Sequence, residues 1–216
     1  MARAPVKETL SIAGPAGNLE ALLETPSDFK GDRVALLCHP HPQYQGTMLN
    51  KVVHTLARAM TDMGIAALRF NFRGVGASEG NYADGIGEIA DVEAVAMSMA
   101  KRWPKAELWL AGFSFGAIVS ARAAANLQPA QLVSIAPAVN LPGRRVEGSL
   151  AVPWLVIQGD ADELVPVAAV RDWVATLDPQ PELVVLPGVD HFFHGQLVTL
   201  RETLLQKLSP LANQSV

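Results

Sequence analysis

Residues 108–120 read LWLAGFSFGAIVS, and they decide the fold. Residues 107–111 predict a strand that is apolar from Leu108 onward and should be buried, and residues 115–126 predict a helix. Between them Gly112-Phe113-Ser114-Phe115-Gly116 forms a G-x-S-x-G sequence. A sharp turn from strand to helix at this place lifts the Ser114 hydroxyl above the sheet, and glycines let the backbones approach closely. The alternative is that Ser114 only caps the helix.

The same alternation of short apolar runs and helical segments continues in both directions along the chain. The predicted strands are 6–13, 19–24, 34–38, 66–70, 107–111, 132–135, 154–158 and 183–186. The predicted helices are 51–63, 87–102, 115–126, 167–176 and 196–208. A turn at 15–18 joins the first two strands as a hairpin, and from residue 34 the order is strand, helix, strand. We therefore predict one domain over 1–216, with a mostly parallel eight-stranded sheet and helices on both faces.

The composition of the chain indicates which binding partners and which cellular location to expect. The formal net charge is −4 and no run of Lys or Arg is present, so we expect no nucleic-acid partner. Cys38 is the single cysteine, and residues 1–14 lack the apolar core of a signal peptide. The most apolar stretch, 108–125, is interrupted by glycine, serine and arginine, so we expect no membrane span. These features favour a cytoplasmic protein. We expect it to be a monomer or a homodimer.

Two later loops supply the partners that a serine nucleophile needs. An acidic loop, 159–166, follows the predicted strand 154–158, and a loop with histidine, 188–194, follows the strand 183–186. Serine, acid and histidine then occur in the order that suits the strand–turn–helix context of the serine. We assign Ser114 as the nucleophile, His191 as its base and Asp162 as the carboxylate that orients the base.

Other acids and histidines nearby receive structural interpretations. Asp160 is closer to the strand end, and we expect it to form a turn or cap the loop. We expect His194 to begin the last helix and His54 to be an ordinary helix residue. Arg73, in the tight loop 69–80, should be structural and pair with an acid. The glycines of that loop lack the spacing and the following helix of a dinucleotide-binding motif.

The loop 38–48 follows a predicted strand and is the place for an oxyanion hole. The backbone N–H of Phe115 should supply one donor, and the N–H of His41 or Tyr44 the second. Pro40 and Pro42 have no N–H and can only stiffen the loop. A zinc site at the His-Pro-His sequence is the alternative, but no carboxylate or cysteine completes a recognisable ligand spacing. We expect no metal and no organic cofactor.

Taken together, these motifs resemble small bacterial α/β-hydrolases with a Cys-His-Pro-His-Pro loop, related to dienelactone hydrolases and short carboxylesterases. The resemblance spans the chain from residue 34 onward, and it rests on 38–42 with 46–48 and 50–51, on 69–80, on 112–116, on 159–165 and on 191–195. It implies an α/β-hydrolase fold without a lid or cap domain. It also implies the same three residues, Ser114, Asp162 and His191, as the catalytic triad. The family has a glycine where Gln45 stands here.

The sequence thus predicts a serine hydrolase. We expect a carboxylesterase that acts on small or short-chain acyl esters through an acyl-enzyme. The activity should rise with pH through about 6.5–7, where a histidine base loses its proton. A thioesterase or peptidase with the same triad is an alternative, and so is a binding or regulatory module with low turnover.

Overall fold

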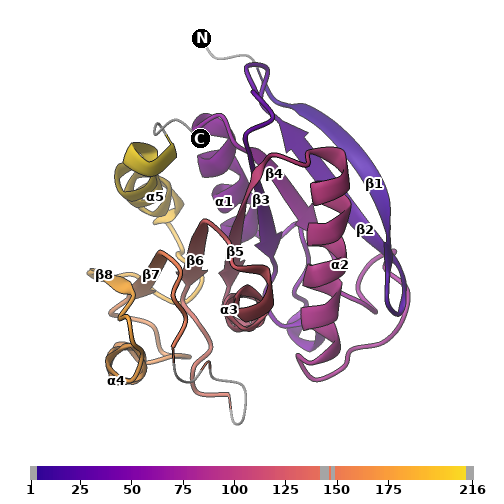
Figure 1. The fold of residues 1–216 in the computed structure, drawn as a ribbon. Helices are drawn as coiled ribbons and strands as arrows, with labels where there is room; N and C mark the ends of the chain where they lie inside the picture. The colour runs from indigo at the N-terminus through magenta and orange to yellow at the C-terminus, as the bar shows by residue number, and fades with distance from the viewer. Residues whose placement is uncertain (1–3, 142–145, 147–148, 213–216) are drawn as a thin grey trace.

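The computed structural model describes residues 4–141, 146 and 149–212 and contains one eight-stranded sheet (Figure 1). The strands are β1 (Val6–Gly14), β2 (Gly17–Thr25), β3 (Arg33–Cys38), β4 (Ala66–Phe70), β5 (Glu107–Phe113), β6 (Gln131–Ile135), β7 (Trp154–Gly159) and β8 (Glu182–Leu186). Their order in the sheet is β1-β2-β4-β3-β5-β6-β7-β8. β1 and β2 form an antiparallel hairpin, β2 pairs antiparallel with β4, and all other pairs are parallel.

Helices cover both faces of this sheet, as predicted (Figure 1). They are α1 (Lys51–Asp62), α2 (Gly87–Arg102), α3 (Phe115–Leu127), α4 (Val167–Ala175) and α5 (Leu197–Ala212), with a 3-10 helix η1 (Pro42–Tyr44). Two separate apolar clusters form the core. One joins α2, α3 and α4 to one face, and the other joins α1 and α5 to the opposite face. Apart from the first two residues of β5, which are half-buried, the central strands are buried because helices cover both sides of the sheet.

The predicted elements agree with the observed ones to within a few residues. β5 extends two residues further than predicted, to Phe113, because its last residues still pair with β6. The prediction that His194 begins the last helix is wrong: α5 begins at Leu197, after a tight turn at Gly195. The connection expected over 136–150 falls partly outside the described residues.

The parallel strands bring their carboxyl ends to one edge of the sheet. β3, β5, β7 and β8 end there, and each is followed by one of the loops that the sequence singled out. In such a sheet the crevice beyond the carboxyl ends is where ligands bind. The fold therefore gathers these loops at a single place.

Candidate active site

Ser114 occupies the sharp turn between β5 and α3. Its backbone has φ 55° and ψ −115°, in the left-handed half of conformational space that non-glycine residues rarely adopt. Neighbouring backbone makes this turn possible only with glycine on either side. A Cβ at Gly112 would overlap the carbonyl of Gly116, and one at Gly116 would overlap the carbonyls of Cys38 and His39. Such strain persists only where the surrounding structure imposes it, and it is concentrated at functional sites.

The structure brings Ser114, His191 and Asp162 together although they are far apart in the sequence. The Ser114 Oγ lies 3.1 Å from His191 Nε2, and His191 Nδ1 lies 2.7 Å from Asp162 Oδ2. Both His191 and Asp162 are buried. With Nδ1–H donating to the carboxylate, Nε2 is left to accept the proton of the serine hydroxyl. This geometry is what a serine nucleophile and its base require.

The carboxylate of Asp162 has a partner for each oxygen. Oδ1 accepts from the backbone N–H groups of Leu164 and Val165 at 2.9 and 2.7 Å. Oδ2 accepts from Gln158 Nε2 at 2.9 Å and from His191. Burial by itself raises the pKa of Asp162, but the hydrogen bonds from His191, Val165 and Gln158 outweigh it, and the net pKa is lowered. Asp162 is therefore held as a carboxylate.

Asp160 and His194 lie near this site but outside its hydrogen-bond chain. Asp160 accepts the backbone N–H of Gly188 at 2.6 Å and so joins the acidic loop to the loop after β8, which is the capping role predicted for it. The side chain of His194 is exposed and pairs with Asp190 at 2.8 Å.

The loop after β3 is organised by His39. This imidazole is fully buried, its Nδ1 lies 2.6 Å from the carbonyl oxygen of Pro40, and its Nε2 accepts the backbone N–H of Phe72 at 3.0 Å. Burial lowers the pKa of His39 to about 4. Gln45 has φ 62°, a left-handed conformation that glycine adopts without cost. Position 45 thus has a backbone conformation that suits glycine, although the residue here is glutamine.

The predicted oxyanion donors have different surroundings in the structure. The N–H of Phe115 is in the first turn of α3, where a helix has no internal acceptor for it. The ring of His41 packs on the ring of Phe115 with centroids 4.7 Å apart. The proposal of Tyr44 is not supported, because its N–H donates to the carbonyl oxygen of His41 at 3.0 Å and closes η1. The N–H of His41 stays a prediction.

The ring nitrogens of both histidines in this loop, which zinc would need as ligands, already have hydrogen-bond partners. Both nitrogens of His39 are engaged by backbone. In His41, Nδ1 accepts from the N–H of Gln43 and Nε2 lies 3.1 Å from the hydroxyl of Tyr82. Within the described ranges no group of three or more His, Cys, Asp and Glu residues could hold a metal ion.

Gln158 is a site residue that the sequence analysis missed. It lies buried near the end of β7 and donates from Nε2 to Asp162 and to the carbonyl oxygen of Val165, both at 2.9 Å. A polar side chain at the end of the apolar run WLVIQ, directly before the acidic loop, was the signal available.

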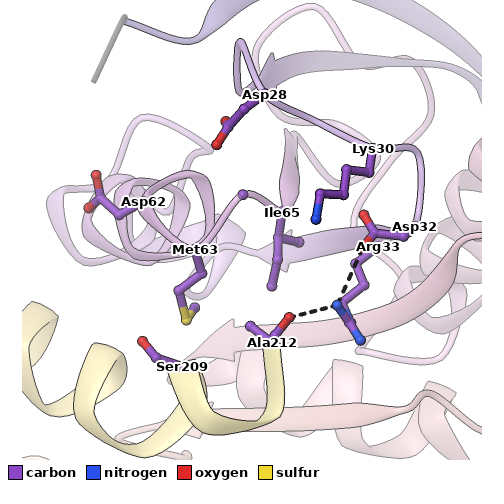
Figure 2. Close-up of a pocket in the computed structure, with 10 residues that line it drawn as sticks. Asp28, Lys30, Asp32, Arg33, Asp62, Met63, Ile65, Ser209 and Ala212 are labelled. Atoms are coloured by element: carbon purple, nitrogen blue, oxygen red, sulfur yellow. Dashed lines mark hydrogen bonds and ion pairs between the residues drawn. The ribbon is translucent and has the colours of Figure 1, made fainter. Parts of the chain in front are cut away.

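A polar hollow lies at the opposite end of the sheet from Ser114. Its volume is about 410 Å³, and it is enclosed by the segments that precede β3 and β4 and by the end of α5 (Figure 2). Figure 2 shows the Arg33 guanidinium reaching the carbonyl oxygen of Ala212 and the carboxylate of Asp32, at 2.7 and 3.4 Å. These contacts join the end of α5 to β3. Because the hollow lies at the other end of the sheet, it is separate from the candidate active site.

None of the helices in the described ranges has the length and hydropathy needed to cross a membrane.

Residues 47–147 match the protein family described as serine aminopeptidase, S33. The chain is also 34% identical over 190 residues to an uncharacterized protein of Rickettsia prowazekii (strain Madrid E), a match that covers 83% of this chain and 79% of the relative.

Solved structures of similar proteins share both the fold and much of the sequence. An α/β serine hydrolase homologue from Coxiella burnetii is 45% identical with a TM-score of 0.90, over 93% of this chain and 97% of that one. A protein from Xanthomonas campestris, described as an α/β serine hydrolase without a lid, is 43% identical with a TM-score of 0.88, over 97% of each chain. With this similarity along almost its whole length, the chain belongs to the α/β serine hydrolase family.

Proposed function

We propose that the protein is a carboxylesterase that cleaves small or short-chain acyl esters, with Ser114, His191 and Asp162 as its catalytic triad. The observation that carries the proposal is the chain of contacts from Ser114 Oγ to His191 Nε2 at 3.1 Å and from His191 Nδ1 to Asp162 at 2.7 Å. Family membership supports hydrolysis, and the triad geometry supports a covalent acyl-enzyme.

In the proposed reaction, Ser114 Oγ attacks the carbonyl carbon of the ester while its proton passes to His191 Nε2. The negative charge on the carbonyl oxygen is stabilised, in this proposal, by the N–H groups of Phe115 and His41. The bond to the alcohol then breaks, and His191 returns the proton to the departing oxygen. Water repeats the sequence on the acyl-enzyme and releases the acid. Asp162 keeps its negative charge throughout and holds the imidazole in the required tautomer.

The test is a panel of nitrophenyl esters, thioesters and lactones, with wild type and Ser114→Ala assayed together. Loss of the triad serine should lower turnover by about a millionfold. A fluorophosphonate probe should label the wild type and not the variant. Equal activity of the two proteins on every substrate would overturn the assignment, and absence of labelling in the wild type would favour a binding module with low turnover.

A peptidase is the second candidate, because residues 47–147 match a family described as serine aminopeptidase. The same triad would act, with an amine as the leaving group. Aminoacyl nitroanilides in the panel distinguish the two: turnover of a nitroanilide that is lost in Ser114→Ala favours the peptidase, and turnover confined to esters favours the esterase. Lactones test the resemblance to dienelactone hydrolases.

Cytoplasmic location and assembly as a monomer or homodimer are part of the same proposal. Cell fractionation and the molecular mass in solution test them.

A further inference from the structure

A groove with a volume of about 530 Å³ lies between the segment that enters α1 and the segment that follows His191. Val52 and Phe193, both buried, line it from below. Leu49 and Phe192 line it from opposite sides, and they are 67% and 47% exposed although both are large apolar side chains. A volume of this size falls in the range of small-molecule sites. Nothing in the proposed triad chemistry accounts for this groove.

The groove begins beside the imidazole of His191. The ring of Phe192 stands edge-on to the ring of His191, with centroids 5.1 Å apart. The opposite wall begins at Gln45 and Thr47, in the same loop as His41, whose ring packs on Phe115. The two loops that line the groove are therefore the ones that carry His41 and His191.

The proposed proton transfers decide which part of a substrate lies on this side. His191 Nε2 hands its proton to the oxygen of the departing alcohol, so that oxygen must lie next to the imidazole when the bond breaks. The oxyanion donor at Phe115 faces the carbonyl oxygen instead. A chain attached to the alcohol oxygen can then continue along the wall formed by residues 192–193.

We propose that this groove is the leaving-group subsite of the enzyme and that it binds the apolar alcohol part of the ester. The inference rests on the proposed esterase function. The lining also restricts the charge of the alcohol. Lys51 and His194 are its charged or titratable side chains, and none of its lining residues is acidic. The subsite thus suits neutral or anionic alcohols of several carbons and disfavours cationic ones.

Two isomeric esters separate this subsite from an acyl subsite. Hexyl acetate and ethyl hexanoate contain the same atoms, but the six-carbon chain is on the alcohol in the first and on the acid in the second. The value of kcat/KM reports acylation, during which the alcohol is still bound. Leu49→Ser should lower kcat/KM for hexyl acetate by about tenfold and leave ethyl acetate and ethyl hexanoate within about twofold of wild type.

The matched control is Val198→Ser, which removes another exposed apolar side chain, 68% exposed, on α5 and outside the groove lining. It should leave all three esters unchanged. Leu49→Trp, which narrows the groove, should also lower kcat/KM for hexyl acetate alone. An equal effect of Leu49→Ser on both isomers, or a loss confined to ethyl hexanoate, would overturn the subsite while leaving the esterase intact. A wild type that hydrolyses no ester in the panel overturns the proposed function itself.

Discussion

At the scale of the residue, the surroundings of two buried side chains decide their charge: Asp162 is ionised and His39 is neutral. Asp162 has a lowered pKa because the hydrogen bonds from His191, Val165 and Gln158 outweigh the cost of burial. Its contribution to stability is present above the ordinary aspartate value of about 3.9 and is lost as pH falls through the lower folded value. His39 is held neutral instead, because burial of its imidazole lowers its pKa to about 4.

Asp162→Asn should leave the fold intact and lower kcat/KM by about ten-thousandfold, because an amide does not hold the imidazole in the productive tautomer. The measurement is ester hydrolysis at neutral pH. Asp160→Asn, in the same loop but outside the hydrogen-bond chain, is the control and should stay within about tenfold of wild type, as expected for a loop contact. Similar losses in both variants would remove Asp162 from the triad.

The neutral state of His39 predicts a pH-dependent stability. A folded pKa of about 4 lies below the ordinary histidine value, so the unfolded chain binds the proton more readily. This residue should therefore lower the free energy of unfolding by roughly 2 kcal/mol as pH falls from about 7.5 to 5. His39→Gln, which can still donate and accept, should remove this part of the slope in urea unfolding, whereas His194→Gln should not. An unchanged slope in His39→Gln would contradict the assignment.

At the scale of the element, close backbone contacts and one buried ion pair fix the loops around the site. α3 approaches the end of β3 so closely that only glycine fits at position 116. The loop after β4 is tied to α2 by Arg73, whose Nε and Nη2 donate to the buried carboxylate of Asp91 at 3.0–3.1 and 2.7 Å. The hydrogen bond to Asp91 raises the pKa of Arg73. This is the structural role, with an acidic partner, that the sequence predicted for Arg73.

Asp91→Asn should lower the free energy of unfolding by about 3–5 kcal/mol, because it leaves the largely buried Arg73 guanidinium without its counter-charge. Denaturant unfolding measures the change. Glu93→Gln lies on the same helix and alters only an exposed contact with Asn126, so it should change stability by less than about 0.5 kcal/mol. If Asp91→Asn lowered the free energy of unfolding by no more than Glu93→Gln does, the Arg73–Asp91 ion pair would not be needed for stability.

At the scale of the whole molecule, the candidate active site and the contacts of Arg33 lie at opposite ends of the sheet. The loops after β3, β5, β7 and β8 form the candidate active site. At the other end Arg33 contacts the carbonyl oxygen of Ala212 (Figure 2), and it also contacts the carboxylate of Glu107. One side chain thereby connects β3, β5 and α5.

Arg33→Met keeps the apolar stem of the side chain and removes its charged hydrogen bonds. We expect the free energy of unfolding to fall by about 2 kcal/mol. Because the contacts lie at the far end of the strands from Ser114, kcat/KM should stay unchanged. A loss of activity in folded Arg33→Met, measured at a temperature well below its unfolding midpoint, would show that the two ends are coupled.

The sequence by itself determined the order of the elements and the residues worth examining. Apolar periodicity marks elements whose faces must be buried, and glycines around Ser114 mark a turn that other residues cannot form. Residue types in a local pattern do not give the backbone geometry of a loop or the contacts of its side chains, and this is where the sequence analysis fell short. The bond from the Tyr44 N–H to His41, the support of Asp162 by Gln158 and the start of α5 at Leu197 depend on the folded shape of these loops.

The tertiary structure alone decided which side chains meet. Residues 114, 162 and 191 converge because parallel strands deliver their carboxyl ends to one edge, and only coordinates give the 3.1 and 2.7 Å distances that join them. The groove between residues 45–52 and 192–197 is likewise invisible in the sequence, since its walls come from opposite ends of the chain. Patterning can specify what is buried, but the relative position of loops is set by the packing of the whole sheet and its helices.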